Sequence, residues 1–184
     1  QHEWPNLAPA TIQHKGFVNA QVAEKWAREH FVNPDQVFVT GSSAGSYGAI
    51  LNSAYLQEGV YPSSDFAVLG DGGNGVVPQS CLEHQISKWG IANTLPKWIP
   101  ALDKPVAELD ASKLWGEAAN FYKTNRFANY STAYDGGSGG QVGFYQIMLS
   151  PDSFVTWFTW WAPSCKWNDG MRAQTSGAFA QAPA

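Results

Sequence analysis

Residues 41–45 read Gly-Ser-Ser-Ala-Gly, the G-x-S-x-G pattern in which the middle serine can be a nucleophile. The pattern directly follows residues 36–40, a β-branched and aromatic run typical of a buried strand, and opens residues 44–56, which read as a helix. A strand-to-helix turn of this kind lifts Ser43 clear of the sheet and places the Ala44 N–H to donate to an oxyanion. The alternatives are a small-residue packing turn and a phosphate-binding loop at a helix start.

Two aspartates are candidates for the acid that orients a catalytic base. Asp71 and Asp135 follow predicted strands at residues 66–69 and 126–134, and glycines follow each of them. The carboxyl ends of parallel strands meet at one edge of a sheet, where sites form. After a nucleophile on such a turn the acid precedes the histidine in the chain, so we assign the acid to Asp135. Asp71 would line the pocket or cap a turn.

The histidines are the difficulty for a catalytic reading. The chain has four of them: His2, His14, His30 and His84. None follows Asp135, although the base is expected after the acid. Without an imidazole, Ser43 would be a poor nucleophile at neutral pH. One alternative has His84, which lies between Ser43 and Asp135, swing in as the base.

Strand and helix candidates alternate along the chain, which predicts a parallel α/β sheet. The strand candidates are residues 36–40, 66–69 and 126–134, and the helix candidates are residues 17–31, 44–56 and 141–149. Because a typical sheet has about five or six strands, we expect elements to be missing at one or both ends.

The remaining segments carry weaker signals. Residues 78–122 are rich in tryptophan and broken at Pro96, Pro100 and Pro105, and we expect short helical pieces that form a cap or lid. Residues 1–13 read as a loop. The tail after Gly170 is small and polar, and we expect it to be loose.

Bulk composition narrows the class of protein. The 184 residues fit one domain, and with 44% hydrophobic and 14% charged residues the chain is globular. A net charge of -4 without any basic run argues against nucleic acid or an anionic membrane as partner. No apolar run is long enough to span a membrane. The chain starts at Gln1 without Met or a signal-peptide pattern, so we expect a processed, engineered or incomplete start.

Three further residue types leave alternatives open. Cys81 and Cys165 could form one disulfide or remain free thiols. Seven of the nine tryptophans fall between residues 89 and 167, where they could stack on sugars, although large core residues are the commoner role. Asn129 begins an N-glycosylation sequon, but it overlaps a predicted strand, so we expect it to be unused.

Three blocks of the sequence resemble the pectin acetylesterase/Notum family, particularly its microbial branch. They read HKGFVNAQVAEKWAREHFVNPDQVFVTGSSAGSYGAI, LGDGGNGVV and STAYDGGSGGQVGFYQIM, within residues 12–150. The resemblance implies an α/β-hydrolase-like fold and a secreted serine esterase that deacetylates a plant cell-wall or related polysaccharide, without metal or cofactor. It matches Ser43 to the nucleophile, Ala44 to the oxyanion donor and Asp135 to the triad acid, whereas His14 matches a helix-start position.

The chain departs from the family pattern in three ways. Ser42 stands where the family often has cysteine, which should spare the turn. The family's base histidine follows the aspartate by some tens of residues, and its glycine-rich oxyanion loop would precede residue 1. We therefore expect the 184 residues to be the central part of a longer protein with the base beyond Ala184. The competing hypothesis is a carbohydrate- or partner-binding protein without catalysis on an esterase scaffold.

Overall fold

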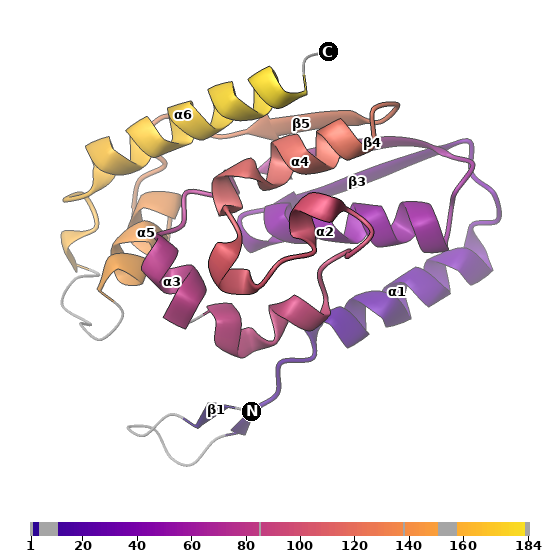
Figure 1. Cartoon of the computed structure of the whole chain (residues 1–184), viewed down its shortest axis with the longest axis horizontal. Helices are drawn as coiled ribbons and strands as arrows, with labels where there is room; N and C mark the ends of the chain where they lie inside the picture. Colours follow the sequence, from indigo (N-terminus) through magenta and orange to yellow (C-terminus); the bar gives the residue numbers. More distant parts are fainter. Residues whose placement is uncertain (1, 4–10, 85, 138, 151–157, 183–184) are drawn as a thin grey trace.

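The centre of the protein is a three-stranded parallel sheet. The computed structural model describes residues 2–3, 11–84, 86–137, 139–150 and 158–182. Its main strands are β3 (Gln36–Ser42), β4 (Asp65–Asp71) and β5 (Arg126–Tyr130), paired in the order β3-β4-β5 (Figure 1). The predicted parallel α/β arrangement is confirmed. The third strand is shorter than predicted, because it ends at Tyr130.

Helices close one face of this sheet. Phe66 and Val68 on β4 are each 1% exposed, and they point toward the side that carries α2 (Ala44–Gly59) and α4 (Leu114–Phe121). On the opposite face, Phe38 and Tyr130 are 63% and 58% exposed. Parallel sheets are usually covered on both faces. In the part of the chain that the structure describes, only one face of the sheet is well covered.

Helix α1 (Gly16–His30) confirms the first predicted helix but not a buried face. Its periodic apolar residues Val18, Val22 and Trp26 are each more than half exposed. The helix attaches to α2 through the ring of Phe17, whose centroid lies 4.9 Å from that of Tyr55. In Figure 1 it lies along the edge of the molecule, apart from α4 and from α6 (Ser164–Gln181). The apolar period therefore predicted the helix and not its environment.

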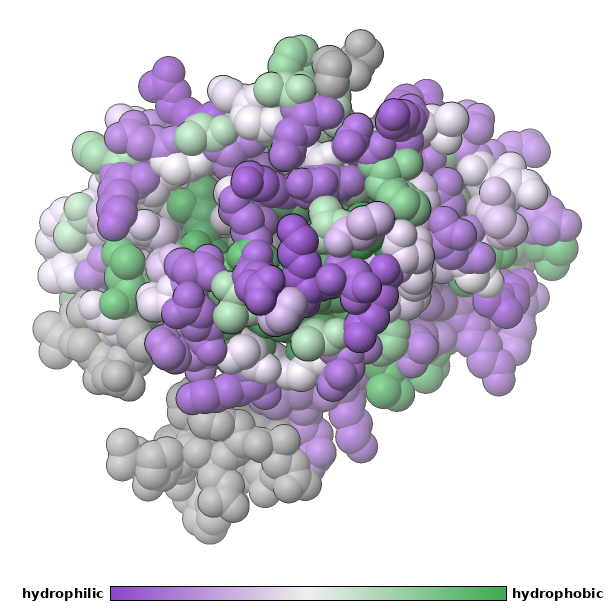
Figure 2. All heavy atoms as spheres, viewed as in Figure 1, coloured by the Kyte–Doolittle hydropathy of each residue, from purple (hydrophilic) through white to green (hydrophobic). Residues whose placement is uncertain are grey.

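The segment expected to form a cap contributes to the core. After α3 (Gln79–His84), it winds through 3₁₀ turns at Ile86–Trp89, Ile91–Asn93, Pro100–Leu102, Val106–Glu108 and Ala111–Lys113 into α4. Ile99, Leu102 and Tyr122 pack with Ala54 of α2. Hydrophilic side chains cover most of the outer face of this layer (Figure 2). A lid role over the site stays a prediction.

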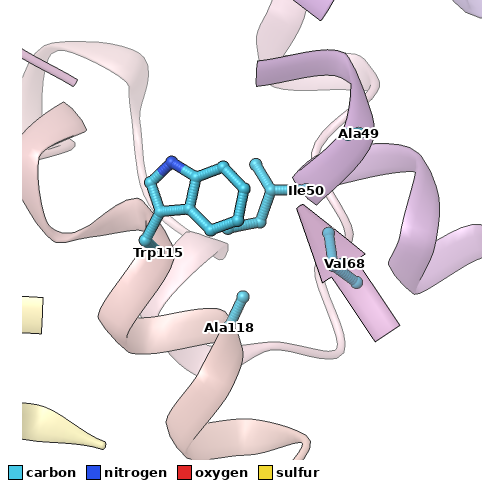
Figure 3. Close-up of a cluster of buried hydrophobic side chains, with 5 residues drawn as sticks. All are labelled: Ala49, Ile50, Val68, Trp115 and Ala118. Carbon is cyan, nitrogen blue, oxygen red and sulfur yellow. The ribbon is translucent and has the colours of Figure 1, made fainter. Parts of the chain in front are cut away.

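Trp115 joins that segment to the sheet. Its indole is 3% exposed and packs with Ile50 of α2, Val68 of β4 and Ala118 of its own helix (Figure 3). Its Nε1–H donates to the carbonyl oxygen of Gly73 at 3.0 Å. The core reading of the tryptophans therefore holds for Trp115, and for Trp167 on α6, which is also buried.

The last helix overturns one prediction. We expected a loose tail after Gly170, but α6 (Ser164–Gln181) continues through it. Trp167 packs against Val142 and Tyr145 of α5 (Gln141–Leu149). The bounds of α5 confirm the helix predicted at residues 141–149. The other buried residues of α6 are the polar Asn168 and Gln174, so no apolar period marked the helix.

The ends of the chain and the cysteines complete the description. Two-residue strands β1 (His2–Glu3) and β2 (Thr11–Ile12) pair antiparallel within the stretch expected to be a loop, and residues 4–10 lie outside the described part. Cys81 is buried, Cys165 is exposed, and both are free thiols. Among the described helices, none is long and apolar enough to cross a membrane.

Replacing Trp115 tests this arrangement. Trp115→Ala should lower the free energy of unfolding by about 3–5 kcal/mol, because it leaves a large cavity. Trp115→Phe should lower the free energy of unfolding by less, about 1 kcal/mol, because it mainly removes the hydrogen bond to the Gly73 carbonyl oxygen. Urea unfolding measures both changes, with Trp89→Ala as the control because Trp89 is 55% exposed. Equal losses in Trp115→Ala and Trp89→Ala would contradict the assigned core.

Candidate active site

Ser43 occupies a strained turn between β3 and α2. Its backbone has φ 56° and ψ -118°, and it is the residue immediately before the first helical residue, Ala44. A positive φ is uncommon outside glycine, and such conformations cost about 1–3 kcal/mol. The predicted strand–turn–helix context of a nucleophilic serine is therefore present.

Two backbone contacts hold this turn. The Ser43 N–H donates to the carbonyl oxygen of Asp71 at 2.7 Å, one step beyond the Ser42–Asp71 pair that closes the β3–β4 ladder. A Cβ placed on Gly41 would collide with the carbonyl oxygen of Gly45, whereas a Cβ on Gly45 would meet nothing within 4 Å. Of the two glycines in the motif, only the first is required by close packing.

Asp135 reaches the same edge from the segment after β5. A Cβ placed on Gly72 would lie 3.6 Å from Asp135 Oδ2 and 4.0 Å from the Ser43 nitrogen, so the carboxylate and the turn flank the same glycine. Partial burial raises the pKa of the Asp135 carboxyl, the Gln141 backbone N–H acts in the opposite direction, and the nearby Asp71 charge raises it further. The net pKa is above its ordinary value.

Sequence reasoning assigned no role to Gln141, yet this residue joins Ser43 to Asp135. Its side-chain Nε2 donates to Ser43 Oγ at 3.1 Å, and its backbone N–H donates to the Asp135 carboxylate. The two ends of the Ser43 contact are 98 residues apart, so no local pattern could reveal it. A neutral amide cannot accept the hydroxyl proton as a base does, so Gln141 positions Oγ rather than activating it.

One carbonyl oxygen fixes the loop beneath the site. Gly73 accepts hydrogen bonds from Ser46 Oγ at 3.3 Å, Trp115 Nε1 at 3.0 Å and Asn129 Nδ2 at 3.3 Å. These donors come from α2, α4 and β5. Asn129 Oδ1 also accepts from Asn74 Nδ2 at 3.0 Å, so the amide of the sequon is engaged inside the fold. This supports the expectation that the sequon is unused.

The histidines with described side chains lie elsewhere. His14 faces the ring of Trp89, with centroids 6.4 Å apart, and His30 stacks on Trp26 at 4.4 Å. His84 is 73% exposed in its side chain, and its Nε2 lies 4.0 Å from a carboxylate oxygen of Glu83. None of these three imidazoles contacts Ser43, so the His84 alternative gains no support from the structure.

Nothing in the described residues gathers three or more His, Cys, Asp or Glu side chains in a metal-holding cluster.

Comparisons with protein-family models, with curated proteins and with solved structures found no match. The fold and the site therefore define an α/β chain with a strained serine turn at the carboxyl edge of its parallel sheet.

The unequal roles of the two motif glycines give a matched test. Gly41→Ala should destabilise the protein by about 1–3 kcal/mol, because its Cβ has no space beside the Gly45 carbonyl. Gly45→Ala should be neutral or stabilising by up to about 1 kcal/mol, because alanine favours the helix. Chemical denaturation measures both changes. A Gly45→Ala variant as unstable as Gly41→Ala would refute the turn geometry.

The raised pKa of Asp135 predicts a pH-dependent stability difference. The folded state favours the protonated carboxyl, so ionisation of Asp135 reduces stability as pH rises through the folded pKa. Asp135→Asn should therefore have a higher Tm than the parent at pH 7, and this difference should vanish near pH 3. Thermal unfolding at both pH values measures it. An Asn variant that is less stable than the parent at pH 7 would be the contrary result.

Proposed function

We propose that the protein is a serine carboxylic-ester hydrolase of the α/β-hydrolase type that removes acetyl groups from a polysaccharide. The observation that carries the proposal is the Ser43 backbone at φ 56° and ψ -118°, between a parallel strand and a helix. Asp135 lies beside the same loop, in the chain order that a triad acid takes. The substrate class and a secreted location follow the resemblance to the pectin acetylesterase/Notum family.

In the proposed reaction, Ser43 Oγ attacks the ester carbonyl carbon while a base takes the hydroxyl proton. The Ala44 N–H has no intrahelical acceptor, because it belongs to the first turn of α2, and it donates to the oxyanion. The base returns the proton to the departing sugar oxygen, which leaves as a hydroxyl group, and an acetyl ester remains on Ser43. Water activated by the same base then releases acetate.

The proposal requires a base that the described residues do not bring to Ser43. Gln141 holds Oγ by its Nε2–H in this structure and cannot take the proton itself. An imidazole that reaches Oγ would be oriented by Asp135, whose carboxylate already accepts the Gln141 backbone N–H. Gln141 then keeps the hydroxyl and the acid in a fixed relation while the base acts.

A second candidate function is carbohydrate or partner binding without catalysis. The observation that favours it is that Ser43 Oγ accepts a hydrogen bond from the Gln141 side-chain amide instead of contacting an imidazole. Tyr130 ends β5, Tyr134 directly precedes Asp135, and the exposed rings of both tyrosines offer stacking faces for a sugar. Glycan binding with no ester cleavage by the same preparation would favour this candidate.

Covalent labelling with a fluorophosphonate tests the nucleophile directly. We expect the label on Ser43 and not on the adjacent Ser42, read by peptide mass spectrometry. Free imidazole should accelerate labelling by about tenfold or more if a base is what the turn lacks, since positioned bases contribute about 10²–10⁴-fold.

The controls are Ser43→Ala, which should abolish labelling, and Ser42→Ala, which should leave it unchanged. Labelling of Ser42 and Ser43 at the same slow rate, with or without imidazole, would refute the hydrolase and leave the binding candidate.

A further inference from the structure

A cavity lies apart from the residues assigned to the active site. It has a volume of about 520 Å³ and is formed by the loop after β4, the 3₁₀ turn Ala111–Lys113 and helix α6. Neither Ser43, Asp135 nor Gln141 lines it. Pockets that bind small molecules have volumes of about 300–1,000 Å³, so this one is large enough for a ligand.

Gln174 is the unusual residue in this pocket. It is 4% exposed and is one of the residues that line the cavity, yet neither its Nε2 nor its Oε1 has a hydrogen-bond partner among the described residues. Leaving a buried polar group unsatisfied costs about 1–3 kcal/mol, so such groups are rare in folded proteins. The amide offers two donor hydrogens and one acceptor oxygen to whatever enters the pocket.

The same face of α6 keeps the cavity open. Gly170, Ala173 and Gly177 line the pocket at helical spacing on both sides of Gln174. A Cβ added to Gly177 would meet nothing within 4 Å. Glycine inside a helix costs about 1 kcal/mol relative to alanine, and no packing contact at this position requires it.

The remaining lining indicates a neutral ligand. The charged lining residues are Asp110 and Lys113, and they pair with each other at 3.4 Å. Asp110 also accepts the Ser112 backbone N–H at 3.0 Å. Leu82 and Tyr145 add apolar walls. An adjacent donor and acceptor between apolar walls suit two neighbouring hydroxyl groups on a ring.

We propose that this pocket binds a neutral polyhydroxylated ring, a monosaccharide unit, through the Gln174 amide. The proposal does not depend on ester hydrolysis, because none of the residues assigned to that reaction lines the pocket. Loss of sugar binding and loss of labelling at Ser43 are therefore separate outcomes.

The test uses D-galactose and D-xylose as probes, with the full chain, by titration calorimetry and by NMR of the side-chain amides. Binding of at least one of them should shift the Gln174 amide signals. Gln174→Leu should weaken that binding at least about tenfold, as expected when two hydrogen bonds of about 1 kcal/mol each are lost. The same variant should unfold at a higher temperature than the parent, because it removes a buried unsatisfied amide.

Three variants separate binding from folding. Gly177→Leu should block the pocket while keeping the helix, and Thr175→Val, on the exposed side of α6, should bind as the parent does. Ser43→Ala should also bind normally. The proposal is overturned if neither sugar binds at tens of millimolar, if Gln174→Leu binds as well as the parent, or if Ser43→Ala abolishes binding. Tighter binding of D-galacturonate than of D-galactose would overturn the neutral ligand class.

Discussion

The hydrogen bond from the Ser43 N–H to the Asp71 carbonyl oxygen, 2.7 Å long, is the constraint on which the site depends. It adds one contact to a ladder whose last pair is Ser42 and Asp71, so the sheet sets the direction of the serine backbone. The positive φ of Ser43 is locally unfavourable and persists because its surroundings determine it. Oγ is thereby presented at the edge where Asp135 arrives, and Gln141 bridges the two.

The loop after β4 connects this turn with the core and with the pocket that Gln174 lines. The Gly73 carbonyl oxygen accepts a hydrogen bond from Nε1–H of Trp115 in the core. This bond links the site to the packing between α2 and α4. Two residues further on, the Gly75 N–H donates to the Tyr47 hydroxyl at 3.0 Å, and Gly75 lines the pocket. The positive φ of Gly75, 76°, favours glycine at this point. Stability, the candidate site and the pocket therefore share one short segment.

Local patterns predicted the parts of the fold that local chemistry determines. The strand run of residues 36–40 and the helix after the turn were visible in the sequence, and so was the position of Asp135 after a strand. Contacts between distant segments were not. Gln141 contacts Ser43 across 98 residues of sequence, so no local pattern marked this contact. Helix α6 buries the polar Asn168 and Gln174, so it showed no apolar period. Helix α1 shows the converse, because its period is clear and its apolar face is exposed.

The central claim is that Ser43 and Ala44 form a nucleophile and its oxyanion donor. A crystal structure of the chain after reaction with a fluorophosphonate tests it most directly. The account predicts a bond from Ser43 Oγ to phosphorus, with a phosphonyl oxygen about 2.7–3.1 Å from the Ala44 nitrogen and a positive φ at Ser43. An adduct on another residue, or a phosphonyl oxygen pointing away from Ala44, would contradict it.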